Sequence, residues 1–117
     1  MIETILKNFI DGNTNYTAYF EIPKNIPDTF FVIEKLSGSR DEQIDSAMMA
    51  VQTYSTSMYN TASLCETLNN TVLDKLADLP EITKVTLNSS YNHPDTAIKR
   101  YRYQSVFEIY YYGGNET

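Results

Sequence analysis

The chain has 117 residues and a formal net charge of -6, with 42% hydrophobic and 21% charged side chains. This length suits one domain with one core, and the composition is typical of a folded globular protein rather than a disordered one. The acidic balance argues against a surface that wraps DNA, because phosphate binding needs clustered lysine and arginine.

The sequence contains one cysteine and no recognisable targeting segment. Cys65 cannot form an internal disulfide, which is compatible with a reducing compartment. Because Cys65 lies on an apolar helical stripe, we expect it to be a small buried hydrophobe. Residues 1–10 do not resemble a signal peptide, and no apolar run approaches the ~20 residues of a membrane helix. We therefore expect no membrane contact.

The first third of the chain predicts one helix and two strands. Apolar side chains recur at helical spacing over residues 2–11, and Gly12 is the expected C-cap. Alternation over residues 18–22 predicts a half-buried strand. Residues 30–36 predict a second strand, apolar enough to be covered on both faces. Residues 37–39, with the sequence Ser-Gly-Ser, are the expected turn after it.

Residues 41–54 fit two interpretations. The spacing of Ile44, Ala47, Met48 and Val51 suits a helix, and alanine, methionine and glutamine favour one. The same residues also alternate as a strand buried on one side would. Local propensity favours the helix, and the residues alone leave both interpretations open.

The clearest element is a long amphipathic helix over residues 57–79. The possible N-caps are Ser55, Thr56 and Ser57, and Pro80 cannot continue the hydrogen-bond ladder. Spacings of three and four place seven side chains on one apolar stripe: Met58, Ala62, Cys65, Leu68, Val72, Leu76 and Leu79.

Two further strands follow the helix. Residues 82–90 predict a strand with Val85 and Leu87 pointing inward, and residues 91–99 predict a loop. Residues 101–112 predict the longest strand, whose odd-numbered and even-numbered side chains face opposite ways.

Residues 1–112 are therefore expected to form a single α+β domain, and residues 113–117 a flexible tail. The expected order is α-β-β-β-α-β-β. In this fold a mostly antiparallel sheet of about five strands packs on the long central helix, with the short N-terminal helix beside it.

No group of residues predicts a catalytic, cofactor or metal site. His93 is the only histidine, and it precedes a proline in a loop. Asp41, Glu42 and Asp45 lack the glycine and the terminal glutamate of a calcium loop, so a solvated acidic turn is the better interpretation.

A basic group interleaved with tyrosines opens the last strand. Lys99, Arg100 and Arg102 alternate with Tyr101 and Tyr103, a pattern that can bind single-stranded nucleic acid. Three cations in an acidic chain support that function weakly. We instead expect the arginines to pair with carboxylates, across the sheet or across a subunit boundary.

Several runs of the chain resemble the tail-terminator, or tail-completion, proteins of long-tailed phages and Gram-positive prophages. They are sheet, loop and packing signatures rather than catalytic motifs, and they span most of residues 27–112. The matching runs are Phe31-Val32-Ile33-Glu34-Lys35, Ser37-Gly38-Ser39-Arg40, Asp45-Ser46-Ala47, Val51-Gln52-Thr53-Tyr54-Ser55, residues 59–68, residues 88–95 and Arg100-Tyr101-Arg102-Tyr103-Gln104-Ser105-Val106-Phe107-Glu108.

The resemblance implies a sheet flanked by helices and a homo-oligomeric ring, expected to be a hexamer. Such a ring caps the tail tube, joins the tail to the head connector proteins and lets DNA pass without binding it specifically. It implies a virion protein that is assembled in the cytoplasm of the bacterial host. The resemblance also favours the strand, beginning near Ile44, in the ambiguous segment.

Two groups of contact residues follow as hypotheses. The dense aromatic run and the polar loops favour Arg100, Tyr101, Arg102 and Tyr103 as subunit or tube contacts. Acidic Asp41, Glu42 and Asp45 would face a lumen, where their charge repels the phosphates of passing DNA.

Three other functions remain open. The chain resembles neighbouring neck and head-closure proteins in size, it is compatible with a small binding module outside phages, and an enzyme with a cryptic site is a further alternative.

Overall fold

The sheet of this protein joins strands from both halves of the chain. The computed structural model describes residues 1–112, and the expected tail at residues 113–117 lies outside the described part. The elements are α1 (Ile2–Asn13), β1 (Ala18–Tyr19), β2 (Phe30–Asp41), β3 (Ile44–Ser55), α2 (Met58–Lys75), the 3-10 turn η1 (Leu76–Asp78), β4 (Ile82–Asn92) and β5 (Tyr101–Tyr111). The strand order is β1-β2-β3-β5-β4, and only the β1–β2 pair is parallel. The expected α+β fold and its element order are confirmed.

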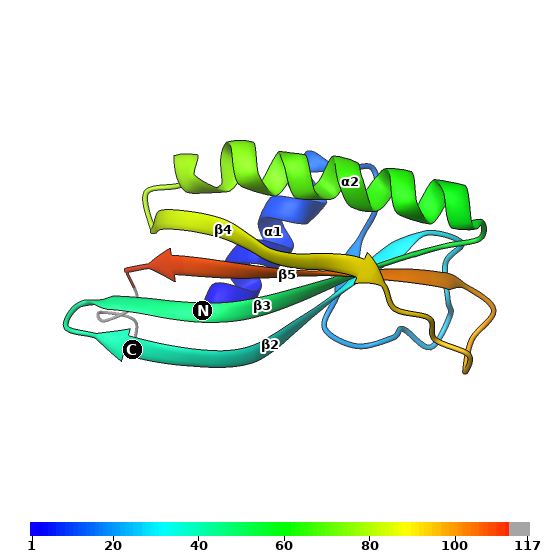
Figure 1. Cartoon of the computed structure of the whole chain (residues 1–117), viewed down its shortest axis with the longest axis horizontal. Helices are drawn as coiled ribbons and strands as arrows, with labels where there is room; N and C mark the ends of the chain where they lie inside the picture. The colour runs from blue at the N-terminus through cyan, green and yellow to red at the C-terminus, as the bar shows by residue number, and fades with distance from the viewer. Residues whose placement is uncertain (113–117) are drawn as a thin grey trace.

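Both helices cover the same face of the sheet. Figure 1 shows α2 running along the sheet, while α1 crosses behind the strands. One apolar cluster joins the helices to the sheet. It contains Leu6 of α1 and Leu68 of α2, together with the inward-facing side chains of β2, β3 and β5, such as Phe31, Met49 and Phe107. Burial of these side chains is the main driving force that holds the two layers together. The opposite face carries no helix within residues 1–112, and we call it the open face.

A second, smaller cluster covers one end of the open face. Phe30 and Tyr54 stack with ring centroids 4.6 Å apart, and Tyr19 and Ile98 pack against them. Tyr19 comes from β1 and Ile98 from the loop between β4 and β5, so these two segments meet over this end of the sheet.

The long helix forms as its apolar spacing predicts. The Ser57 hydroxyl accepts a hydrogen bond from the backbone N–H of Asn60 at 3.1 Å, which caps the first turn. Cys65, Leu68 and Val72 are buried, whereas Met58 remains 46% exposed. The apolar stripe therefore begins later than the sequence indicates, and the buried residue of the first turn is Thr61 rather than Met58.

Residues 44–55 form a strand, as the resemblance favoured and local propensity did not. Neighbouring strands β2 and β5 pair along the whole length of β3 and bury most of its second half. This tertiary context outweighs the helix preference of alanine, methionine and glutamine.

The expected strand over residues 18–22 is wrong in length. Only Ala18 and Tyr19 pair with β2, and Phe20 is 48% exposed. Lys7 Nζ donates to the Ala18 carbonyl at 2.7 Å, and the Asp11 carboxylate accepts from the Ala18 N–H at 2.8 Å. These two side chains of α1 fix the backbone at Ala18, so the chain pairs with β2 over two residues and then leaves the sheet.

Two expected boundaries are also wrong. Gly12 lies inside α1, which ends at the C-cap Thr14. The Ser-Gly-Ser segment does not turn: β2 continues through Gly38 to Asp41, and the hairpin closes at Glu42 and Gln43. Glycine and serine favour turns, but the pairing of β2 with β3 keeps this segment extended.

Candidate functional site

The two predicted contact arginines are anchored inside their own chain. The Arg102 Nε–H donates to the His93 carbonyl at 2.6 Å, and Arg102 Nη1 donates to the Tyr54 hydroxyl at 3.1 Å. Asp95 lies 3.6 Å from the same guanidinium. Arg100 Nε donates to the Pro27 carbonyl at 3.0 Å. The arginines therefore fasten the loop at residues 93–100 to the body of the protein.

Tyr54 gives this anchor a buried partner. Burial raises the pKa of Tyr54, and the hydrogen bond from Arg102 acts in the opposite direction. The phenol consequently stays neutral near pH 7 and accepts the guanidinium hydrogen bond. Arg102 is thus a structural residue of the described chain, whether or not it also meets a neighbour.

Tyr101 is the most accessible of the four predicted contact residues. Its side chain is 46% exposed, whereas Arg100 and Arg102 keep only 17% and 16% of their side-chain surface. Tyr103 is half-buried on the helix-covered face. The structure brings all four to one end of the sheet, but Tyr101 offers most of the free aromatic surface there.

The three predicted acidic residues lie on the β2–β3 hairpin without converging. Asp45 forms a two-point ion pair with Arg40, with Nε and Oδ1 2.7 Å apart. The hydrogen bond from Arg40 lowers the pKa of Asp45. Asp41 and Glu42 are exposed near the end of the hairpin. The charge of Asp45 is therefore already compensated, and two acidic side chains remain available to solvent.

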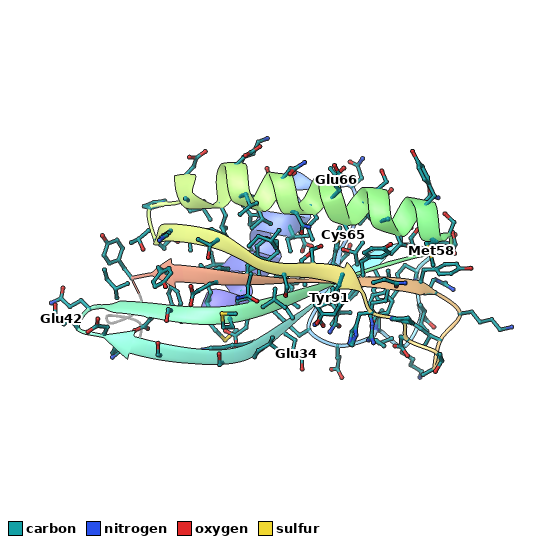
Figure 2. All side chains as sticks on the ribbon, in the orientation of Figure 1. Glu34, Glu42, Met58, Cys65, Glu66 and Tyr91 are labelled. Carbon is teal, nitrogen blue, oxygen red and sulfur yellow. The ribbon has the colours of Figure 1, made fainter. Side chains whose placement is uncertain are left out.

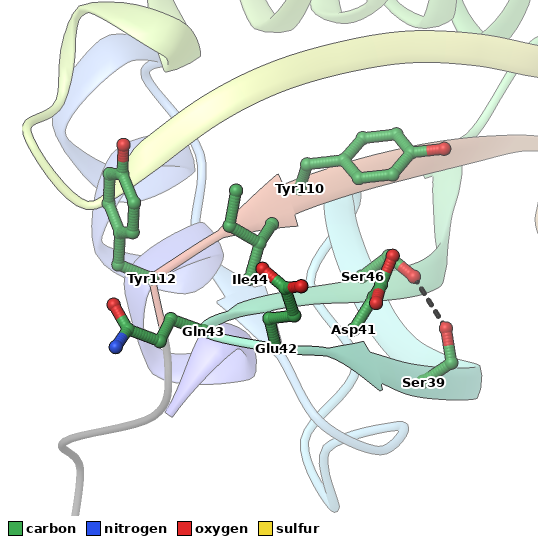
Figure 3. A pocket seen from close by; sticks show the side chains of 8 residues that line it. All are labelled: Ser39, Asp41, Glu42, Gln43, Ile44, Ser46, Tyr110 and Tyr112. Carbon is green, nitrogen blue, oxygen red and sulfur yellow. Dashed lines mark hydrogen bonds between the residues drawn. The ribbon is translucent and has the colours of Figure 1, made fainter.

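A hollow of about 820 Å³ lies between this hairpin end and the last residues of β5. Figure 3 shows its lining, with the Ser39 and Ser46 hydroxyls hydrogen-bonded at 2.8 Å and two tyrosines on the other wall. The lining residues are Ser39, Asp41, Glu42, Gln43, Ile44, Ser46, Tyr110 and Tyr112. The carboxylates of this lining can accept hydrogen bonds, and its hydroxyls and phenols can both donate and accept them.

A separate group of polar side chains forms a closed network under α2. The Ser105 hydroxyl donates to Asn69 Oδ1 at 2.6 Å, and Asn69 Nδ2 donates to the Ser90 hydroxyl at 3.0 Å. Cys65 Sγ lies 3.2 Å from the Ser105 hydroxyl and is buried. These groups satisfy one another and join α2 to β4 and β5. Residues 1–112 contain no cluster of three or more metal-binding side chains.

A row of hydrogen-bonded polar side chains crosses the open face, and the sequence interpretation missed it. Gln52 Nε2 donates to Gln104 Oε1 at 2.9 Å and lies 3.4 Å from Glu34 Oε1. Gln104 Nε2 in turn donates to the Tyr91 hydroxyl at 2.6 Å. We call Glu34, Gln52, Gln104 and Tyr91 the polar ladder. It runs from β2 through β3 and β5 to β4, and Figure 2 labels its two end residues.

The signal for the ladder was present in the sequence. Gln52 and Gln104 each interrupt an apolar strand at an alternating position, and both are 8% exposed. Two such amides call for hydrogen-bond partners, because buried polar groups are costly when unpaired. The missing information was that β3 and β5 are neighbours.

Comparison of the sequence with models of known protein families and with curated proteins finds no match. Within residues 1–112, no helix combines the length and the apolar character needed to cross a membrane.

Proposed function

We propose that this chain is a structural virion protein of the tail-terminator type. It would cap the phage tail tube and join the tail to the head connector by forming a ring, without catalysis and without a cofactor. The observation that carries the proposal is the sequence resemblance. Its runs fall on the paired strands β2, β3 and β5, on the first half of α2, and on the end of β4 with the start of the loop after it.

The shape of the molecule supports a role in assembly. The domain measures 43 × 27 × 23 Å, and the β2–β3 hairpin forms one end of it (Figure 1). An uncovered sheet face and exposed tyrosines at the other end offer contact surfaces of the kind that interfaces use. The partners of this proposal are further copies of the chain, expected as a hexamer, together with tail tube and head connector proteins.

The proposal predicts that the genome encoding this chain also encodes a tail tube protein, and it is tested by adding the purified chain to growing tubes of that protein. Electron microscopy should show that the tubes stop growing and carry a ring at one end. Tyr101→Ser should weaken attachment, because it removes exposed aromatic surface at the predicted contact. Tyr59→Ser is the matched control, since Tyr59 is 80% exposed on α2.

Two results would contradict the proposal. Tubes that grow normally beside an unattached chain would exclude capping. Binding to isolated connectors but not to tubes would instead favour a neck protein. Equal attachment of the two tyrosine variants would remove Tyr101 from the contact while leaving the capping function intact.

A further inference from the structure

Within residues 1–112, most of the outer side of β2 and the whole outer side of β4 carry no neighbouring strand. β1 covers β2 only at Phe31 and Val32, so residues 34–41 have an uncovered side, and every one of them is exposed. On the opposite side, β4 pairs only with β5. Uncovered edges of this length present free backbone N–H and C=O groups that another strand can pair with.

The two edges have complementary directions. Strands β2, β3, β5 and β4 alternate in direction because every pair among them is antiparallel. Four alternating strands leave β2 and β4 running in opposite directions. A second copy placed beside the first in the same orientation therefore presents its β2 antiparallel to β4 and continues the pattern.

The polar ladder ends in a donor at one edge and an acceptor at the other. The Tyr91 oxygen accepts from Gln104, which leaves the hydroxyl hydrogen available to donate. The Glu34 carboxylate has further lone pairs and lies on the exposed part of β2. Tyr91 itself is 41% exposed. Each copy thus carries both halves of one hydrogen bond between neighbours.

Placing Tyr91 opposite Glu34 of a second copy fixes the whole register. β4 has one unpaired residue between Leu87 and Ser89, and β2 has one between Lys35 and Ser37. In this register the two bulges lie next to one another, so the extra residue of β4 is matched by the extra residue of β2 and the pairing stays aligned on both sides. Open-face residues then meet only open-face residues, in the pairs Tyr91 with Glu34, Ser89 with Ser37, Thr86 with Ser39 and Lys84 with Asp41.

Charge agrees with this register. Lys84 comes opposite Asp41 of the second copy, and no like charges face one another in the aligned stretch. Within its own chain, the Lys84 ammonium lies 5.8 Å from the centre of the Tyr110 ring, on the same face. An opposite-charge pair across neighbouring strands adds to the stability of the pairing.

We propose that copies of this chain assemble head to tail by pairing β4 of one copy with β2 of the next. The polar ladder then continues from copy to copy through the Tyr91–Glu34 hydrogen bond. This contact is heterologous, so repetition with a closing rotation makes a ring. The inference makes the proposed ring assembly more specific. Only the closing of the row of copies into a ring rests on the proposed function.

Cysteine cross-linking tests the register without disturbing the ladder. We would prepare Ser37→Cys and Ser89→Cys separately in a Cys65→Ser background, mix the two proteins and oxidise them. Within one chain the two positions lie at least three strand spacings, about 14 Å, apart, too far for a disulfide. The expected product is a dimer that contains one copy of each variant. A chain carrying both substitutions should give a series of covalent multimers.

Matched variants check the specificity of the link. Ser39→Cys should link poorly to Ser89→Cys, because it lies two residues out of register. Tyr91→Phe should lower the yield about fivefold, the effect of one hydrogen bond. Tyr110→Phe should not, because the Tyr110 hydroxyl bonds Glu108 of the same chain at 3.0 Å.

Three outcomes would overturn the edge pairing: homodimers of Ser89→Cys alone as the main product, equal linking through Ser39, or monomers only. Tube capping by a chain that fails to cross-link would retain the proposed function and reject this contact. Specific cross-linking by a chain that caps no tube would retain the contact and reject the proposed function.

Discussion

Glu42 adopts a left-handed backbone conformation, with φ of 59°, at the end of the β2–β3 hairpin. For residues other than glycine, this backbone conformation costs about 1–2 kcal/mol. Backbone strain of this kind motivates a hypothesis of function, and here it places a carboxylate at the tip of an exposed hairpin.

Replacing this residue by glycine should therefore stabilise the isolated protein. We expect Glu42→Gly to raise the free energy of unfolding in urea by about 0.5–1 kcal/mol, because strain is removed and only part is lost again to chain entropy. The neighbouring Gln43→Gly is the control and should lower stability by about 0.5–1 kcal/mol. A loss of stability in both variants would contradict the argument.

Among the elements, α2 holds the two layers together through a few buried side chains. Leu68 is 1% exposed and belongs to the main cluster, whereas Leu73, on the same helix, is 38% exposed. Leu68→Ala should lower the free energy of unfolding by about 2–5 kcal/mol, because it leaves a cavity. Leu73→Ala should cost less than about 1 kcal/mol. Similar losses in urea denaturation would show that the helix packs through another face.

The elements differ in how far the sequence alone determines them. The spacing of Cys65, Leu68 and Val72 defines α2 because a helix signal is local. β3 was ambiguous because burial between two partner strands, rather than residue propensity, makes it a strand. The hairpin turn was misplaced because Glu42 and Gln43 are not typical turn residues.

The candidate contact surfaces were predictable only in part. Exposed Tyr101 and the acidic hairpin stand out by composition, whereas the internal anchoring of Arg102 depends on a loop that folds back onto the sheet. The polar ladder depends on strand order. Its four members are far apart in the sequence, and no local sequence pattern indicates which strands are neighbours in the sheet.

At the scale of the whole molecule, the ends of the long axis differ in character. The hairpin end carries Glu42, labelled in Figure 2, and the other end carries the loop anchored by Arg102. Pairing along the sheet edges would give Asp41 the partner Lys84, and Asp45 already pairs with Arg40. Glu42 then remains the uncompensated acidic residue for the proposed lumen.

Assembled rings should therefore respond to a charge reversal at this site. We expect Glu42→Lys to increase retention of double-stranded DNA by the ring, because a positive wall attracts phosphates. Glu66→Lys makes the same charge change on the exposed surface of α2 and should have no such effect. Equal DNA retention by the two variants, measured by filter binding at low salt, would exclude Glu42 from the lumen.

The network under α2 also has a practical use. Cys65, the only thiol of the chain, is sealed between the helix and the sheet. A thiol reagent can reach Cys65 only while the two layers are separated. The labelling rate of the native protein therefore rises with the extent to which the layers open. Incorporation into a larger particle that restrains the layers would slow labelling, which makes the natural side chain a reporter of assembly.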